Sequence, residues 1–353
     1  MLSNILSLLY TDNTTKIHLL HLGAKTKPIS LYLLPLRLIF VKMKYFRYYP
    51  WGFQLLLFFL MVFTFLSAAA FIIPSIMTKM FGIIPAQLIG IGPDSSSVLV
   101  KVALVLEGVA NLFIFCIPAL IFAYLSTPRP AEYLGLRRPG KNIQLLLVVL
   151  VMLGATPVLQ MLESLIGQIN FGSQIKASQK ANDDMMTAFL NMPNITSFLR
   201  VFIVIAIIPG IGEELFFRGV LLRFAKKRSR NMLFPIVFTA LVFAYSHSNI
   251  YGSLSIFLAG VLLAVIYNLT GSLWCSILAH MSFNGLQIIL SYAANNNAAA
   301  KNYMASNTVP YYLVIAGAVV FAVSFYLLWK NRTPLPPNWT DDFTPAELSQ
   351  NAV

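Results

Sequence analysis

Long apolar segments alternate with short polar connections along most of the chain. Eight of these segments approach the roughly 20 residues that an α-helix needs to cross the hydrocarbon of a bilayer. They are expected at residues 53–77, 102–125, 142–166, 197–220, 232–248, 252–269, 272–292 and 310–329. Because backbone groups in lipid must be hydrogen-bonded within the protein, each segment should be a helix. The pattern predicts an all-α fold, a polytopic transmembrane helix bundle of about eight spans.

The composition agrees with a membrane protein. Hydrophobic residues make up 58% of the 353 positions and charged residues only 10%, whereas a soluble domain carries about 25% charged residues. The net charge of +13 could suggest nucleic-acid binding, but Lys and Arg lie in short stretches between the apolar segments. That distribution follows the positive-inside rule. We therefore expect the lipid bilayer, and no nucleic acid, as a partner.

Basic residues gather in alternate connections. The connection after the second segment contains Arg129, Arg137, Arg138 and Lys141, and the one after the fourth contains five bases between residues 223 and 230. The other connections hold few bases, and the longest of them, 168–196, is expected to lie outside with a short interfacial helix. The pattern predicts an integral membrane protein with both termini cytoplasmic, and we expect it in a bacterial plasma (inner) membrane.

The two ends of the chain differ from the rest. Residues 1–42 mix polar residues with an interrupted apolar piece, so we expect an upstream extension, with translation beginning at Met43. The first two spans would occupy residues 43–126 and the last span residues 293–332. Residues 333–353 are Pro-rich and acidic, and we predict a disordered cytoplasmic tail.

Two adjacent acids lie inside the fourth apolar segment. Glu213 and Glu214 are followed by no other acid until Asp341. An ionisable group in a span costs about 2.5–3.5 kcal/mol on insertion scales, so it is a candidate functional residue. Arg218 lies four residues after Glu214 and can pair with it on one helical face. Glu213 is rotated by about 100° and points elsewhere. Alternatively, both acids only compensate Arg218.

Two histidines accompany these acids. His247 ends the fifth segment, and His280 lies in the seventh, four residues before Asn284. A single membrane histidine more often makes an interhelical hydrogen bond than carries chemistry, but the combination favours a site. At about 1.5 Å per residue, Glu213, His247 and His280 lie about 20, 22 and 12 Å from the cytoplasmic helix ends. They can therefore meet near mid-membrane if the helices tilt.

Three motifs occur in order on successive late spans. They are Glu-Glu-x-x-x-Arg at 213–218, Phe-x-x-x-His at 243–247 and His-x-x-x-Asn at 280–284. In this order they resemble the CAAX-protease and bacteriocin-processing (CPBP, or Abi) family of intramembrane endopeptidases. The resemblance covers residues 127–292, which would form the protease core.

This resemblance implies roles for the motif residues. Glu213 would be the base that activates a water, and His247 would hold that water or a metal. His280 and Asn284 would support the developing oxyanion. Structural or orienting roles would fall to Glu214, Arg218 and Phe243. The substrate would be a peptide or protein at the membrane, of a membrane-associated or prenylated type.

The residue types leave the cofactor open. Glu213, His247 and His280 match the ligands of a catalytic zinc site with one open position. No HExxH motif is present, and a glutamate that binds the metal would need a second base. Glu214 could serve only if it is not locked to Arg218. A metal-free, glutamate-activated water and a zinc site both remain.

Other functions use the same features differently. A protein of the same fold could act without catalysis, in bacteriocin immunity or as a membrane partner. A proton-coupled transporter could use the acids and histidines as a relay, although no internal repeat supports this. The residues do not indicate the oligomeric state.

Overall fold

The computed structural model describes residues 45–295, 297–298, 300–301 and 309–343. The predicted extension at 1–42 lies outside these residues. All regular secondary structure in the described ranges is helical. The long elements are α2 (Trp51–Phe81), α3 (Ser97–Asn111) with α4 (Ile117–Ser126), α6 (Ile143–Ile166), α8 (Ile195–Val201) with α9 (Ile208–Glu214) and α10 (Leu222–Lys227), α11 (Leu233–Ser246), α12 (Ser253–Thr270), α13 (Leu273–Ala294) and α15 (Tyr311–Lys330). Two other helices are α5 (Pro130–Tyr133) and α7 (Ser173–Leu190).

These helices confirm the predicted all-α transmembrane bundle. Each of the eight predicted segments is helical, and within the described ranges seven helices are long and apolar enough to cross a membrane. The exception is α11, which has 14 residues. Its length is about 21 Å at 1.5 Å per residue, less than the roughly 30 Å of hydrocarbon in a bilayer. By itself, α11 is therefore shorter than the thickness of the hydrocarbon.

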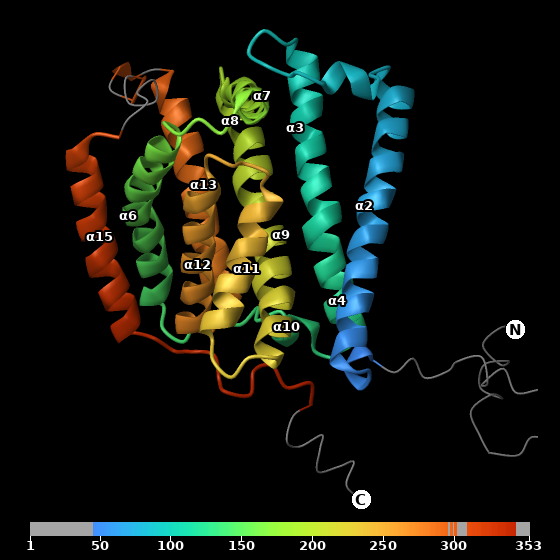
Figure 1. The fold of residues 1–353 in the computed structure, drawn as a ribbon, viewed down its shortest axis with the longest axis vertical. Helices are drawn as coiled ribbons and strands as arrows, with labels where there is room; N and C mark the ends of the chain where they lie inside the picture. Colours follow the sequence, from blue (N-terminus) through green and yellow to red (C-terminus); the bar gives the residue numbers. More distant parts are fainter. Residues whose placement is uncertain (1–44, 296, 299, 302–308, 344–353) are drawn as a thin grey trace, which may run out of the picture. The chain divides into compact units, whose positions relative to one another are not determined.

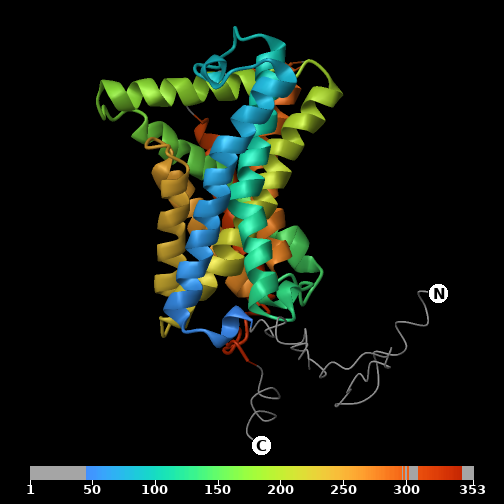
Figure 2. The same cartoon turned by 90° about the vertical axis from the view of Figure 1, so that its right-hand side faces the viewer.

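The spans run roughly parallel, and α7 lies across one end of them (Figures 1 and 2). This helix falls within the connection 168–196, for which an interfacial helix is expected. The start of α2 and the end of α15 both lie at the opposite end of the bundle, on different sides of it (Figure 1). That end also carries the basic connections after α4 and α10.

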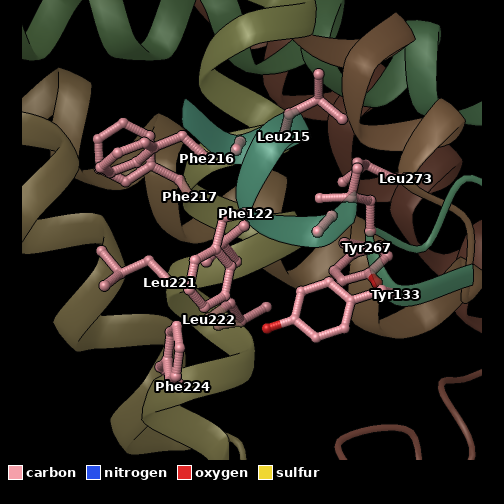
Figure 3. Packing of buried hydrophobic residues seen from close by; sticks show 14 of the residues in the cluster. Phe122, Tyr133, Leu215, Phe216, Phe217, Leu221, Leu222, Phe224, Tyr267 and Leu273 are labelled. Carbon is pink, nitrogen blue, oxygen red and sulfur yellow. The ribbon is translucent and has the colours of Figure 1, made fainter. Parts of the chain in front are cut away.

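Two kinds of packing hold the spans together. Aromatic rings fill the core between α2, α4 and α10, where the ring centres of Phe122 and Phe224 are 5.7 Å apart (Figure 3). Glycines bring α6 and α15 close together, because a Cβ atom on Gly154 would lie 2.5 Å from the backbone nitrogen of Phe321. Such close backbone contact is typical of helices packed in lipid.

The C-terminal strap, residues 333–343, is ordered, and this corrects the prediction of a disordered tail for these residues. The Arg223 guanidinium donates from Nη1 to the carbonyl of Trp339 (2.6 Å) and from Nη2 to that of Asp341 (2.9 Å). Composition alone missed these contacts because the donors come from a helix more than 100 residues away. Residues 344–353 lie outside the described part of the chain.

Candidate active site

Glu213 and Glu214 end the short helix α9, which lies between two π-helical turns, Phe202–Ile207 and Leu215–Leu221. Turns of this kind widen a helix and frequently occur at functional sites. Both glutamates are buried, Glu213 to 7% exposure and Glu214 completely. Because they are consecutive on a helix, their side chains enter two different surroundings.

Glu214 lies in a closed polar cluster. Its Oε1 accepts a bond from Arg218 Nη1 (2.6 Å) and lies 2.9 Å from His280 Nδ1. Its Oε2 accepts a bond from Ser276 Oγ (2.6 Å). Arg218 also donates to the carbonyl of Gly260 (2.8 Å). The predicted pairing of Glu214 with Arg218 is thus present, and it leaves Glu214 engaged on both oxygens and unsuited to act as a base.

Glu213 faces the two histidines. Its Oε2 lies 3.9 Å from Nε2 of His247 and 3.9 Å from Nε2 of His280. Within the described part of the chain, this buried oxygen has no hydrogen-bond partner. Its Oε1 accepts a hydrogen bond from Asn111 Nδ2 (2.9 Å). The structure therefore brings together the three residues on which the predicted site depends.

Hydrogen bonds fix how the two imidazoles point. Nδ1 of His247 lies 2.7 Å from the carbonyl oxygen of Phe243, and Nδ1 of His280 contacts the Glu214 carboxylate. Both partners are acceptors, so each Nδ1 donates and each neutral ring keeps its lone pair on Nε2. Three acceptor atoms thus face one another, and a donor such as a water molecule, or a cation, is needed between them.

The Phe243 ring packs between the groups of the site, and the orienting role expected for it stays a prediction. Its ring centre lies 4.6 Å from that of His247 and 5.8 Å from that of His280. On another side the Arg218 guanidinium lies 4.8 Å from the ring centre, within the range of a cation–π contact. One aromatic ring therefore packs against both imidazoles and the buried arginine.

The end of α11 positions His247. His247 is the residue directly after the last turn of this helix, and Ser248 then turns the chain with a φ of 50°. This turn leaves the imidazole, with 32% of its side chain exposed, beside Glu213.

Asn284 has a different environment from the one predicted. It lines the same cavity as Glu213, and its Nδ2 donates to the carbonyl oxygen of Ile205 (3.0 Å). Pro209 lies four residues after Ile205 and has no N–H, so it cannot make the helical bond to that carbonyl. Asn284 therefore supplies the donor that the proline lacks, while its second N–H stays available to another acceptor.

A cavity of about 350 Å³ connects these groups. It extends from Glu213, His247 and His280 toward α7, whose contribution to the lining is apolar: Met185, Met186, Phe189 and Leu190. The rest of the lining mixes apolar side chains with polar ones, and Asn249, Ser255 and Gln287 are among the polar ones.

The donor set fits zinc by residue type but not by spacing. Zinc ligands lie about 2.0–2.2 Å from the metal, which puts tetrahedral donor atoms about 3.4 Å apart. The separations from Glu213 Oε2 to the two Nε2 atoms are wider, at 3.9 Å. Among the described residues, no three His, Cys, Asp or Glu side chains are arranged to hold a metal. A preformed zinc site is therefore not what this geometry presents.

Sequence reasoning missed Asn111 and Ser276. Asn111 lies in the second predicted span, where a buried amide among apolar residues was a usable signal. Gly212 allows its approach, because a Cβ atom there would lie 2.8 Å from Asn111 Oδ1. Ser276 precedes His280 by one helical turn, and its hydroxyl contact to Glu214 carries no recognisable motif.

Comparison with known proteins gives one result. Residues 195–286 match the family model described as type II CAAX prenyl endopeptidase Rce1-like. No curated protein and no solved structure matches the chain. The matched segment runs from α8 into α13 and includes every site residue predicted from the motifs. It confirms, over residues 195–286, the resemblance of this integral membrane protein to the CAAX-protease family.

Proposed function

We propose that the protein is an intramembrane endopeptidase in which Glu213 activates a water molecule. The observation that carries this proposal is the convergence of Glu213 Oε2 with the two Nε2 atoms, each at 3.9 Å, in one cavity. A water between them can donate one hydrogen to the carboxylate and one to an imidazole. Its oxygen lone pair then points away from these acceptors, toward the cavity.

The reaction needs two proton transfers. As the water oxygen bonds to the scissile carbonyl carbon, Glu213 takes one of its protons, and the carbonyl oxygen becomes an oxyanion. When the carbon–nitrogen bond breaks, the protonated Glu213 gives this proton to the leaving amine. The second hydrogen of the water stays with the new carboxylic acid until it ionises. Each step uses a group that lies at the cavity.

The oxyanion requires donors in a low-dielectric site. Asn284 offers its second amide hydrogen, since only one is used by the Ile205 carbonyl. His280 offers an N–H from Nε2 when the ring is protonated on both nitrogens, a form that the adjacent Glu214 carboxylate accommodates. These are the roles that the family resemblance implies for both residues.

Substrate access follows from the position of the cavity. The cavity reaches toward α7, whereas the basic connections lie at the opposite end of the bundle (Figure 1). We propose that this basic end faces the cytoplasm of a bacterial cell, in its inner membrane. Membrane-associated peptides would then enter beneath α7 or from the side of the bilayer.

The decisive experiment compares the wild type with Glu213→Gln in liposomes and in cells. The amide keeps the shape and the bond from Asn111 but cannot take a proton, so cleavage should fall by about 10²- to 10⁴-fold. Glu132→Gln, at an exposed site in α5, is the matched control. Retained cleavage in Glu213→Gln would remove the assigned base. An unchanged cellular phenotype in that variant would favour a non-catalytic role.

A further inference from the structure

Two more carboxylates line the active-site cavity, and the proposed reaction uses neither. They belong to Glu107 on α3 and Glu163 on α6. Among the described residues, neither carboxylate has an ion-pair or hydrogen-bond partner. Acids inside spans are costly and usually compensated, so two without a partner in one cavity call for an explanation.

The cavity also lacks the opposite charge. The described residues that line it include Glu107, Glu163 and Glu213 but no Lys or Arg, although the chain as a whole has a net charge of +13. The side chain of Glu213 is more than nine-tenths buried, and its Oε2 is unpartnered. The protein therefore supplies an anionic cavity with an unsatisfied acceptor and leaves the compensating cation to come from elsewhere.

The acids occupy two different places in the cavity. Glu107, on α3, lines the cavity together with Glu213. Glu163 lies near the connection between α11 and α12, where a Cβ atom on Gly252 would be 3.2 Å from its Oε1. Their helices, α3 and α6, stand on opposite sides of α9 (Figure 1). A bound chain would thus pass one carboxylate on either side of the catalytic glutamate.

Resting on the peptidase function proposed above, we propose that the site selects apolar peptide segments that carry a cationic group close to the scissile bond. A Lys or Arg side chain, or a free α-amino group, supplies the missing counter-charge to Glu107 or Glu163. The rest of the segment would contact the apolar part of the lining, which includes Phe189, Phe283 and Ile288. In a cavity of lower dielectric constant than water, a carboxylate attracts a cationic group more strongly.

The test uses the full chain in liposomes and three quenched fluorescent peptides. They share one apolar sequence and differ at a single residue beside the scissile bond, which is Lys, norleucine or Glu. For the wild type, the KM for the Lys peptide should be about tenfold below that for norleucine, as one charge interaction in a partly wet site would give. The Glu peptide should bind more weakly than both.

Variants assign the preference to the two acids. Glu107→Gln and Glu163→Gln keep the side-chain shape and remove one charge each. Each variant should therefore lower the KM for the norleucine peptide divided by the KM for the Lys peptide, towards a value of one. Glu132→Gln, on α5 and outside the cavity lining, should leave that ratio unchanged. A ratio that stays the same in both cavity variants would overturn the assignment.

Binding and cleavage are read separately. Anisotropy of labelled peptides on the same liposomes reports the charge preference without turnover. Equal binding of all three peptides to the wild type would refute the proposed charge preference and would not affect the proposed peptidase function. Tighter binding of the Lys peptide without any cleavage supports the inference and refutes the peptidase. A preference for the Lys peptide that appears only after EDTA treatment would show that a metal cation is the counter-ion in the untreated protein, which also overturns the proposal.

Discussion

The Asn111 side chain holds one oxygen of the Glu213 carboxylate. Its Nδ2 donates to Oε1 over 2.9 Å, while Oε2 is left facing the two imidazoles. The donor comes from α3, outside the segment that matches the protease family. This bond prevents the carboxylate from rotating, so the oxygen directed at the histidines is always the same one.

Asn111→Ala should therefore impair catalysis more than binding. Hydrogen bonds to charged groups contribute about 1.5–3 kcal/mol, so we expect kcat to fall by about 10- to 100-fold with little change in KM. Asn111→Asp should lose more, since it places a second carboxylate against Glu213. Steady-state kinetics in liposomes provides the measurement. An unchanged kcat in Asn111→Ala would show that Glu213 needs no such support.

The two histidines should differ in their effect on stability. His280 contacts the buried Glu214, so His280→Ala should abolish cleavage and lower the free energy of unfolding by about 1–3 kcal/mol. His247 is partly exposed and bonds only its own helix through the Phe243 carbonyl. His247→Ala should abolish cleavage at nearly wild-type stability. Thermal unfolding in detergent checks this, and equal losses of stability would contradict it.

Glu214→Gln should destabilise the fold, in contrast to Glu213→Gln. Arg218 is 1% exposed and would lose its only carboxylate partner among the described residues. Breaking a buried ion pair by removing one partner typically costs about 3–5 kcal/mol. We expect lower yield and a lower unfolding temperature for Glu214→Gln only. Near-wild-type unfolding of this variant would mean that Ser276 and His280 suffice to hold the cluster.

Removal of metal ions should leave cleavage intact. The 3.9 Å separations suit a water between Glu213 and the histidines better than they suit zinc. Activity after dialysis against EDTA should match that of the untreated protein, and elemental analysis should find less than one zinc per chain. Activity that is lost in EDTA and restored by zinc would establish the metal-dependent alternative.

The strap should stabilise the end of the bundle where it docks. Arg223→Met removes the donors to the strap carbonyls and should lower the free energy of unfolding by about 1–3 kcal/mol. Asp342→Asn weakens the pair that Asp342 forms with Lys227 at 2.6 Å and should cost less. Arg138→Gln, exposed at the same end and outside the pocket that the strap lines, serves as the control. Equal stability of all three variants would argue against a structural role for the strap.

The sequence predicts local relationships well and distant ones poorly. The Glu214–Arg218 pair follows from a four-residue spacing, and the helical state of each apolar segment follows from lipid alone. The bond from Asn111 to Glu213 joins residues 102 positions apart, which no local spacing reveals. The end of α11 at Ser246, in contrast, lies within two residues of the end predicted for the segment 232–248. The family motifs placed Asn284 at the site but did not disclose its bond to Ile205.

The end of α11 brings the connection to α12 beside α7. The backbone from His247 to Gly252 is mostly non-helical, and Ser248 and Ile250 line a small pocket together with residues of α7. Asn249 of this connection and Met185 of α7 also line the cavity that holds Glu213. The connection and α7 therefore form one rim of that cavity.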